Sequence, residues 1–414
     1  MREGFFWADM PTAPYGEGAA FLTAAGGQDV LRYHQSFPQY TQTPLAKLDG
    51  LAARLGIKGL YIKDESYRFG LNAFKVLGGS YAMGRWIAGR LGIAPEEMTY
   101  DHLTSEEVRG KLGEVTFISA TDGNHGRGVA WTAKALGQKS VIYMPSGTAR
   151  ERLENIRKLG ADASILDTNY DDCVRLAAQH ARERGWVMVQ DTAWEGYEEI
   201  PRWIMQGYAS MALEASGQLE GVTPTHVFLQ AGVGSLAGAV AGLLRDVYKK
   251  QPPRVFIVEP NKADCLYQTA RQNDGRLHAV AGSLDTIMAG LACGEVCTIA
   301  WDVLKETAQA VISCPDWVAA HGMRVLGNPE KGDERVISGE SGAVTTGLAA
   351  AAMQREDLAW LRDALGLDEK SVVLCFSTEG DTDQQNYRDV VWQGKYPSDP
   401  KHTGEYNQQK GREV

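Results

Sequence analysis

The sequence predicts an α/β protein in which mostly parallel sheets are flanked by helices. Short β-rich runs alternate with segments of helical periodicity, an order typical of strand–helix–strand units. Several of these runs are apolar throughout, as strands buried on both faces should be. At 414 residues the chain is long enough for roughly two or three domains.

The individual elements follow from composition and periodicity. Helical stripes of apolar residues occupy 148–159 and 170–184. The strand–helix units from about 115 to 191 form one compact block, and the units from 225 onward predict a second sheet. The predicted strands are 59–64, 115–120, 140–144, 163–167, 186–191, 225–230, 254–259 and 371–376.

Charge and cysteine usage narrow the class of protein. The net charge of −10 disfavours nucleic acid and anionic membranes as partners, because both bind basic patches. No stretch approaches the roughly 20 apolar residues of a membrane span, and the first residues lack the pattern of a signal peptide. The six cysteines form no CxxC pair, which predicts free thiols, no metal site and a cytoplasmic location.

A lysine stands in the apolar segment NAFKVLGG at 72–79. Lysine seldom occupies such a run unless its amine is paired or covalently used. Burial alone would depress the pKa of Lys75 and make its amine a nucleophile toward an aldehyde. The competing interpretation is a lysine at a helix start that extends its amine to solvent.

The segment TDGNHG at 121–126 follows a predicted strand and opens a helical pattern. A loop at a helix N-terminus presents free N–H groups to an anion such as a substrate carboxylate. An ordinary capping turn would use the same Asp and Asn residues. We assign His125 no catalytic role, because it can simply pack at this turn.

A glycine-rich loop, GVGSLAG at 232–238, follows the strand at 225–230. Its glycines allow the backbone to approach a phosphate, and the next helix supplies N–H donors. Gly232, Gly234 and Ala237 also fit the dinucleotide-binding fingerprint, with Glu259 ending the next strand. Both interpretations stay open at this point.

The last motif, STEGD at 377–381, follows the strand at 371–376. A hydroxyl of Ser377 or Thr378 could form a hydrogen bond with a heteroaromatic nitrogen. The alternative is a glycine-containing loop with a helix cap.

Together the four motifs follow the order of fold-type II pyridoxal-phosphate (PLP) enzymes, and the chain resembles threonine deaminase, serine dehydratase and the tryptophan synthase β chain. The segments TPL at 43–45 and KDE at 63–65 add to this resemblance. Over about residues 40 to 395 the chain is most similar to the 2,3-diaminopropionate ammonia-lyases. Related enzymes usually carry Ser before Gly-Asn-His, whereas this family carries Asp, here Asp122. The matching segments are KDESYRFGLNAFKVLGG, TDGNHGRGVAW, NYDDCVRLA, QDTAWEGY, IPRWIMQGY, IMAGLACGE, GMRVLGNP, ISGESGA and STEGDTD.

The resemblance implies PLP as the cofactor, held by Lys75 as a Schiff base. It implies elimination of ammonia from diaminopropionate to give pyruvate and two ammonia. Lys75 would take the α-proton of the L-substrate and Asp122 that of the D-substrate. Asp191 would be a second carboxylate, placed for the extra amine of the small amino-acid substrate; the alternative is a turn residue at the end of a strand.

The resemblance also assigns the cofactor contacts. Asn124 would hydrogen-bond the ring oxygen, and Thr378 or Ser377 the pyridine nitrogen. The family implies a homodimer, with residues 1–80 and 199–414 as a large PLP-binding domain and 81–198 as a small domain, the active site lying in the cleft between them. The phosphate would be cradled by the backbone of Gly232, Val233, Gly234, Ser235 and Leu236.

Three other functions remain open from the sequence alone. A dehydratase-type PLP lyase for serine, threonine or another small amino acid would use the same motifs. An NAD-dependent oxidoreductase built on 232–259 leaves Lys75 and the GNHG loop unexplained. A PLP-free binding protein of the same fold would not need Lys75 or Asp122.

Overall fold

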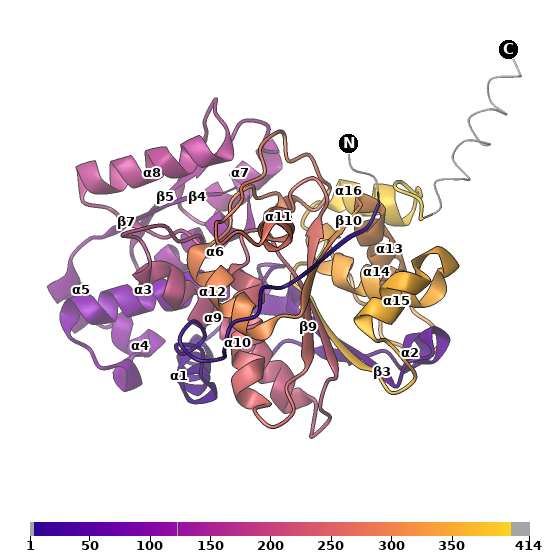
Figure 1. Cartoon of the computed structure of the whole chain (residues 1–414). Coiled ribbons are helices and arrows are strands. Elements are labelled where there is room, and N and C mark those ends of the chain that lie inside the picture. The colour runs from indigo at the N-terminus through magenta and orange to yellow at the C-terminus, as the bar shows by residue number, and fades with distance from the viewer. Residues whose placement is uncertain (1–3, 122, 399–414) are drawn as a thin grey trace, which may run out of the picture.

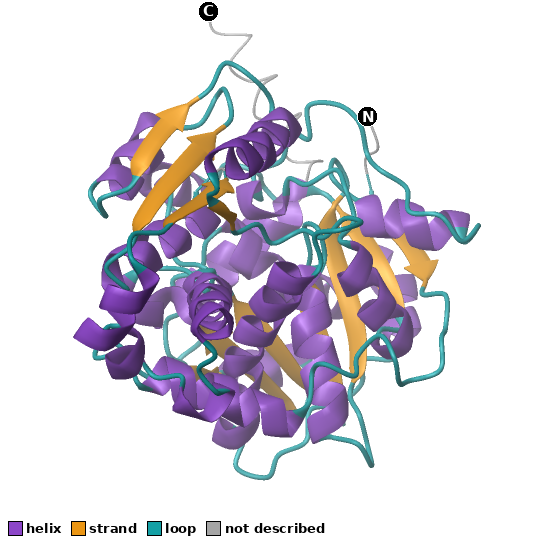
Figure 2. Cartoon of the chain, turned by 90° about the vertical axis from the view of Figure 1, so that its left-hand side faces the viewer, coloured by secondary structure: helices purple, strands orange, loops and turns teal. Residues whose placement is uncertain are grey.

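The structure is a computed structural model that describes residues 4–121 and 123–398. Its strands form two sheets, one of seven strands and one of four. Figure 1 shows the four-stranded sheet with α7 (Arg150–Arg157) and α8 (Tyr170–Arg184) on the left, and Figure 2 shows the sheets as separate groups of strands among helices. The predicted pattern of sheets flanked by helices is therefore present.

The seven-stranded sheet is parallel at its centre and antiparallel at its two edges. The edge strand β1 pairs antiparallel with β10, and the edge strand β2 pairs antiparallel with β3. Every residue of β8, β10 and β11 is buried, because helices cover both faces of the sheet. In spatial order the strands are β1 (Phe6–Asp9), β10 (Ala310–Cys314), β9 (Arg254–Pro260), β8 (His226–Gln230), β11 (Val372–Ser377), β3 (Gly59–Asp64) and β2 (Leu45–Lys47).

The four-stranded sheet is parallel throughout. All of it lies within the predicted small domain, residues 81–198. The boundary predicted between residues 80 and 81 falls inside α3 (Val76–Leu91), so the division into domains stays a prediction. In spatial order the strands are β6 (Asp162–Ile165), β5 (Lys139–Met144), β4 (Thr116–Ala120) and β7 (Val187–Met188).

Helices fill the space between and around the sheets. Among the residues described, none of them is long and apolar enough to cross a bilayer. The remaining helices are α1 (Ala24–Gln35), α2 (Asp49–Leu55), α4 (Tyr100–Leu103), α5 (Glu106–Leu112), α6 (Asn124–Ala135), α9 (Glu199–Gln218), α10 (Ser235–Val247), α11 (Cys265–Gln272), α12 (Thr298–Thr307), α13 (Asp316–Gly327), α14 (Glu340–Gln354), α15 (Ala359–Leu365) and α16 (Gln384–Val391).

The predicted strands all appear, with ends shifted by a few residues. The largest difference is at 186–191, where only Val187 and Met188 form β7 and the chain then leaves the sheet. The sequence did not predict β1, β2 or β10. The helices predicted at 148–159 and 170–184 are α7 and α8.

Glycines set the position of α3, the helix that follows Lys75. A Cβ added to Gly207 of α9 would stand 2.3 Å from the carbonyl oxygen of Leu77, and one added to Gly78 would stand 2.5 Å from the Tyr208 ring. Such distances are below any van der Waals contact, so only glycines allow α3 and α9 to cross this closely. The first turn of α3 is thereby held against α9.

Candidate active site

A cavity of about 450 Å³ opens where strands of both sheets end. Its lining includes residues just after the carboxyl ends of β4, β5, β8 and β11, the edge at which α/β folds bind ligands. Asp122 lies outside the described residues. The predicted site residues that line this one cavity are Lys75, Asn124, Asp191, Gly232, Val233, Gly234, Ser235, Leu236 and Thr378.

Lys75 stands immediately before α3, on a segment tied to the loop after β11. The backbone N–H of Phe74 donates to the carbonyl of Thr378 at 3.0 Å, and that of Gly380 donates to the carbonyl of Asn72 at 3.1 Å. The Lys75 amine lies 5.4 Å from the centre of the Phe74 ring and 5.9 Å from that of Tyr208. The lysine is thus held by backbone and by aromatic packing.

The Lys75 amine donates to the Asp191 carboxylate, although 116 residues separate them. Burial lowers the pKa of the Lys75 ammonium, but the charge and hydrogen bond of Asp191 and the nearby Tyr208 raise it above its ordinary value. Burial raises the pKa of Asp191, but Lys75 and His125 bring it below its ordinary value. The expectation of a depressed lysine pKa is therefore wrong for the protein alone, because a buried carboxylate compensates the ammonium.

His125 packs behind this ion pair. Its Nε2 lies 2.8 Å from the carbonyl oxygen of Val189, and its Nδ1 lies 3.9 Å from an oxygen of Asp191. The ring is 5% exposed and is fixed at its Nε2 end. This agrees with the interpretation of His125 as a packed residue, and adds a contact with Asp191 that the sequence did not indicate.

The glycine-rich loop leads from β8 into the N-terminus of α10. Gly234 has a φ of +101°, a left-handed conformation that favours glycine. Within the described part of the chain, the backbone N–H groups from Gly232 to Leu236 have no protein acceptor. Unpaired N–H groups at the start of a helix are suited to an anion such as a phosphate. The Ser235 hydroxyl donates to the Asp191 carbonyl at 2.6 Å and so links this loop to the ion pair.

Thr378, and not Ser377, lines the cavity. The Thr378 hydroxyl accepts a hydrogen bond from the side-chain amide of Gln230 at 2.8 Å, which leaves its own proton available to a ligand. The Ser377 hydroxyl is fully buried and lies 2.8 Å from the hydroxyl of Ser338. The position of Thr378 favours it over Ser377 as the residue facing a bound ring.

Glu259, the acid of the dinucleotide-type fingerprint, is used elsewhere. It is buried and accepts the backbone N–H groups of Leu266 and Tyr267, at 3.0 and 2.8 Å, in the first turn of α11. Burial raises its pKa well above the ordinary value. It does not line the cavity, so it is not placed to contact a ribose there.

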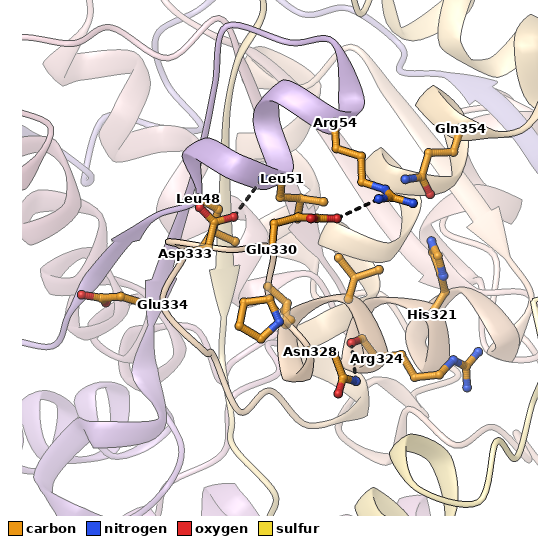
Figure 3. Close-up of a pocket in the computed structure, with 13 residues that line it drawn as sticks. Leu48, Leu51, Arg54, His321, Arg324, Asn328, Glu330, Asp333, Glu334 and Gln354 are labelled. Atoms are coloured by element: carbon orange, nitrogen blue, oxygen red, sulfur yellow. Dashed lines mark hydrogen bonds and ion pairs between the residues drawn. The ribbon is translucent and has the colours of Figure 1, made fainter.

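A second cavity, of about 300 Å³, lies between α2 and α13 (Figure 3). Its charged groups serve the fold: Arg54 pairs with Glu330 at 2.9 Å, and the Asp333 carboxylate accepts the N–H groups of Gly50 and Leu51 at the start of α2. No predicted site residue lines it. We therefore assign the chemistry to the larger cavity.

Comparison with known proteins identifies the family of the chain. The family model for pyridoxal-phosphate dependent enzymes matches residues 37–378. The chain is 51% identical to the diaminopropionate ammonia-lyase of Escherichia coli (strain K12) over 388 residues, which are 93% of this chain and 96% of that protein. The chain belongs to the diaminopropionate ammonia-lyase family. The predicted family, fold class and cofactor are thereby confirmed.

Two solved structures of the Escherichia coli diaminopropionate ammonia-lyase share the fold closely, and each covers 95% of this chain and 98% of its own. The complex with D-serine has a TM-score of 0.88 at 48% identity. The complex with an aminoacrylate-PLP azomethine reaction intermediate has a TM-score of 0.86, also at 48% identity.

The cavity fits the cofactor of this family. PLP carries an aldehyde, a phosphate and a pyridine nitrogen. The cavity presents the Lys75 amine, the unpaired N–H groups of 232–236 and the Thr378 hydroxyl. The side chain of Gln230 also lines this cavity, and its Oε1 atom is buried with no hydrogen-bond partner among the residues that the structure describes. Because buried polar atoms are normally paired, this atom also suggests a ligand.

Sequence reasoning missed several residues of this cavity. Gln230 orients Thr378, Glu379 accepts from Asn124 at 2.6 Å, and Glu340 lines the same wall. Burial, together with the charge of Glu379, raises the pKa of Glu340 to about 7. Gln230 and Glu379 stand in or beside motifs that the sequence indicates, but their roles depend on long-range contacts. Gln230 and Thr378 are 148 residues apart in the chain, and Asn124 and Glu379 are 255 residues apart.

Proposed function

We propose that this protein eliminates ammonia from diaminopropionate, of L and of D configuration, to give pyruvate and two ammonia. The observation that carries the proposal is the Lys75–Asp191 pair, set in one cavity with the phosphate-type loop 232–236. The D-serine complex of the Escherichia coli family member adds support for a D-substrate.

Each residue has a distinct role in this proposal. Lys75 holds the cofactor and, once released from it, takes the α-proton of the L-substrate. Asp191 anchors the Lys75 amine and then faces the extra amine of the substrate. Asn124 donates to the ring oxygen, the N–H groups of 232–236 hold the phosphate, and Thr378 donates to the pyridine nitrogen. When bound, PLP delocalises the charge left after the α-proton is removed, which makes loss of the β-amino group possible.

Reduction with borohydride tests this function directly. The purified protein should be yellow, should bleach on borohydride treatment, and should then carry the cofactor covalently on the peptide that contains Lys75. A label on another lysine would remove Lys75 from its role. A protein that stays colourless after PLP is supplied would be the PLP-free binding protein of the same fold.

Ammonia and pyruvate release from both diaminopropionate enantiomers, serine and threonine separates the two lyase functions. We expect the highest kcat/KM with diaminopropionate. A higher value with serine or threonine would assign the protein to the dehydratase type. We further propose that the protein is a cytoplasmic homodimer, and sedimentation of the holoenzyme tests the dimer.

Asp122 is proposed as the base for the D-substrate, so Asp122→Asn should affect the two enantiomers unequally. General-base catalysis contributes about 10²–10⁴-fold, and an amide cannot accept the proton. We expect kcat/KM for D-diaminopropionate to fall by about 10²-fold or more, and that for the L-enantiomer to fall far less. Equal losses on both enantiomers would contradict the assignment of two bases.

A further inference from the structure

The side chain of Asn124 has a partner that the cofactor assignment does not use. Its amide nitrogen donates to an oxygen of Glu379 at 2.6 Å. A carboxylate only accepts hydrogen bonds, so this contact decides which end of the Asn124 amide faces Glu379. One N–H of the amide is used, and the second remains for another acceptor in the cavity, which both residues line.

Glu379 is itself held in place from several sides. One of its carboxylate oxygens accepts the backbone N–H of Ser341 at 3.2 Å, in the first turn of α14. The other accepts from the Thr382 hydroxyl at 3.5 Å. The N-terminus of this 15-residue helix favours a negative charge at this position. Glu379 is only 6% exposed, so water does not replace these hydrogen-bond partners.

The backbone of Glu379 ties this arrangement to the lysine segment. Its carbonyl accepts the N–H of Gly339 at 2.9 Å, and the residue forms an antiparallel bridge with Ala73, two residues before Lys75. Glu379 is therefore joined to the lysine segment through its backbone and to Asn124 of α6 through its carboxylate.

We propose that Glu379 is a positioning residue that holds the Asn124 amide with its second N–H directed at the ring oxygen of PLP. This inference rests on the proposed contact between Asn124 and that oxygen. With no acceptor-only neighbour, the amide can turn over and present its carbonyl oxygen, which repels an oxygen ligand. In this proposal Glu379 acts on cofactor binding through Asn124.

Glu379→Gln tests the proposal with little change of shape. A Gln side chain can accept from Asn124 or donate to it, so it no longer decides the orientation of the amide. We expect the dissociation constant of PLP to rise about tenfold, and the midpoint of the pH-dependent absorbance change of the bound cofactor to move. The absorbance of bound cofactor comes only from folded protein, so both measurements stay interpretable if the variant is less stable. Glu356→Gln, at an exposed acid away from the cavity, should match the wild type.

A double-mutant cycle with Asn124→Ala shows whether Glu379 acts through Asn124. In the Asn124→Ala background, Glu379→Gln should weaken PLP binding no further. The inference would be overturned if the two substitutions together weaken PLP binding by the product of their separate effects. It would also be overturned if Glu379→Gln alone has wild-type affinity and absorbance. If Asn124→Ala alone has wild-type affinity and absorbance, the proposed contact of Asn124 fails instead, and the role of Glu379 fails with it.

Discussion

Replacing Lys75 with alanine is expected to reduce turnover by at least about 10³-fold, because the residue both holds the cofactor and serves as a base. The substitution also leaves the Asp191 carboxylate, whose side chain is 7% exposed, without its cation. Removal of one partner of a buried ion pair is strongly destabilising, so the thermal midpoint should fall as well. Initial rates of pyruvate release and a thermal melt measure the two effects.

Lys75→Arg separates chemistry from stability. A guanidinium keeps the positive charge beside Asp191, but it stays protonated and does not condense with an aldehyde. We expect this variant to lose turnover as fully as Lys75→Ala and to lose less stability. Lys262→Ala, which removes a lysine paired with Asp316 outside the cavity, should leave turnover unchanged. Turnover that persists in either Lys75 variant would contradict the proposed role.

The strands that the sequence predicts correctly are those with a strong apolar run of their own. Segments such as the one that forms β8 are buried at every residue, so burial on both faces is visible in composition. The two edge strands that it missed, β1 and β2, have only four and three residues. Such short strands depend on the neighbour that pairs with them, which composition does not show.

The missed strand β10 has a different cause. Its residues, AVISC, are mostly apolar and are all buried, but only Ala308 and Gln309 separate the strand from α12. A short apolar run that directly continues an amphipathic helix cannot be distinguished from that helix by periodicity. Its place in the sheet comes from pairing with β9 and β1.

The motif order predicted residues that line one cavity in the structure, but not the electrostatics of that cavity. The apolar neighbours of Lys75 predict a desolvated amine of low pKa. The fold places the Asp191 carboxylate against it, which reverses the direction of the shift. The sign of a pKa shift depends on which charges are neighbours in space, and periodicity carries no information about that.

Glu214→Ala is expected to be among the most destabilising single substitutions outside the cavity. Glu214 of α9 accepts from Lys63 at 2.7 Å and from Arg68 at 2.8 Å, and all three side chains are fully buried. Arg68 also pairs with Glu65 at 2.8 Å, so two cations and two carboxylates balance within the network. Removing Glu214 leaves one buried positive charge uncompensated, which costs about 3–5 kcal/mol.

The pH dependence of stability follows from the same contacts. Burial raises the pKa of Glu214, but hydrogen bonds and charge from Arg68 and Lys63 lower it from 4.5 to about 2. An acid whose pKa is lower in the folded state stabilises the fold above its unfolded pKa. We therefore expect this contribution to be complete above about pH 4.5 and to be lost progressively toward pH 2. Between about pH 4.5 and pH 2, the free energy of unfolding of Glu214→Ala should therefore decrease less than that of the wild type.

We attribute the expected destabilisation to an unpaired buried charge rather than to lost packing. The double variant Lys63→Met/Glu214→Gln tests this. The double variant removes one cation and one anion, so the remaining Arg68–Glu65 pair is neutral. Its urea midpoint should lie above that of Glu214→Gln alone, because no buried charge is left unpaired. Glu107→Gln, at an exposed pair with Lys111, should change stability by about 0.5 kcal/mol or less.

The network joins β3 and the segment before Lys75 to α9, whose Gly207 packs against α3. A Glu214 variant as stable as Glu107→Gln would mean that these buried charges do not hold the lysine segment in place.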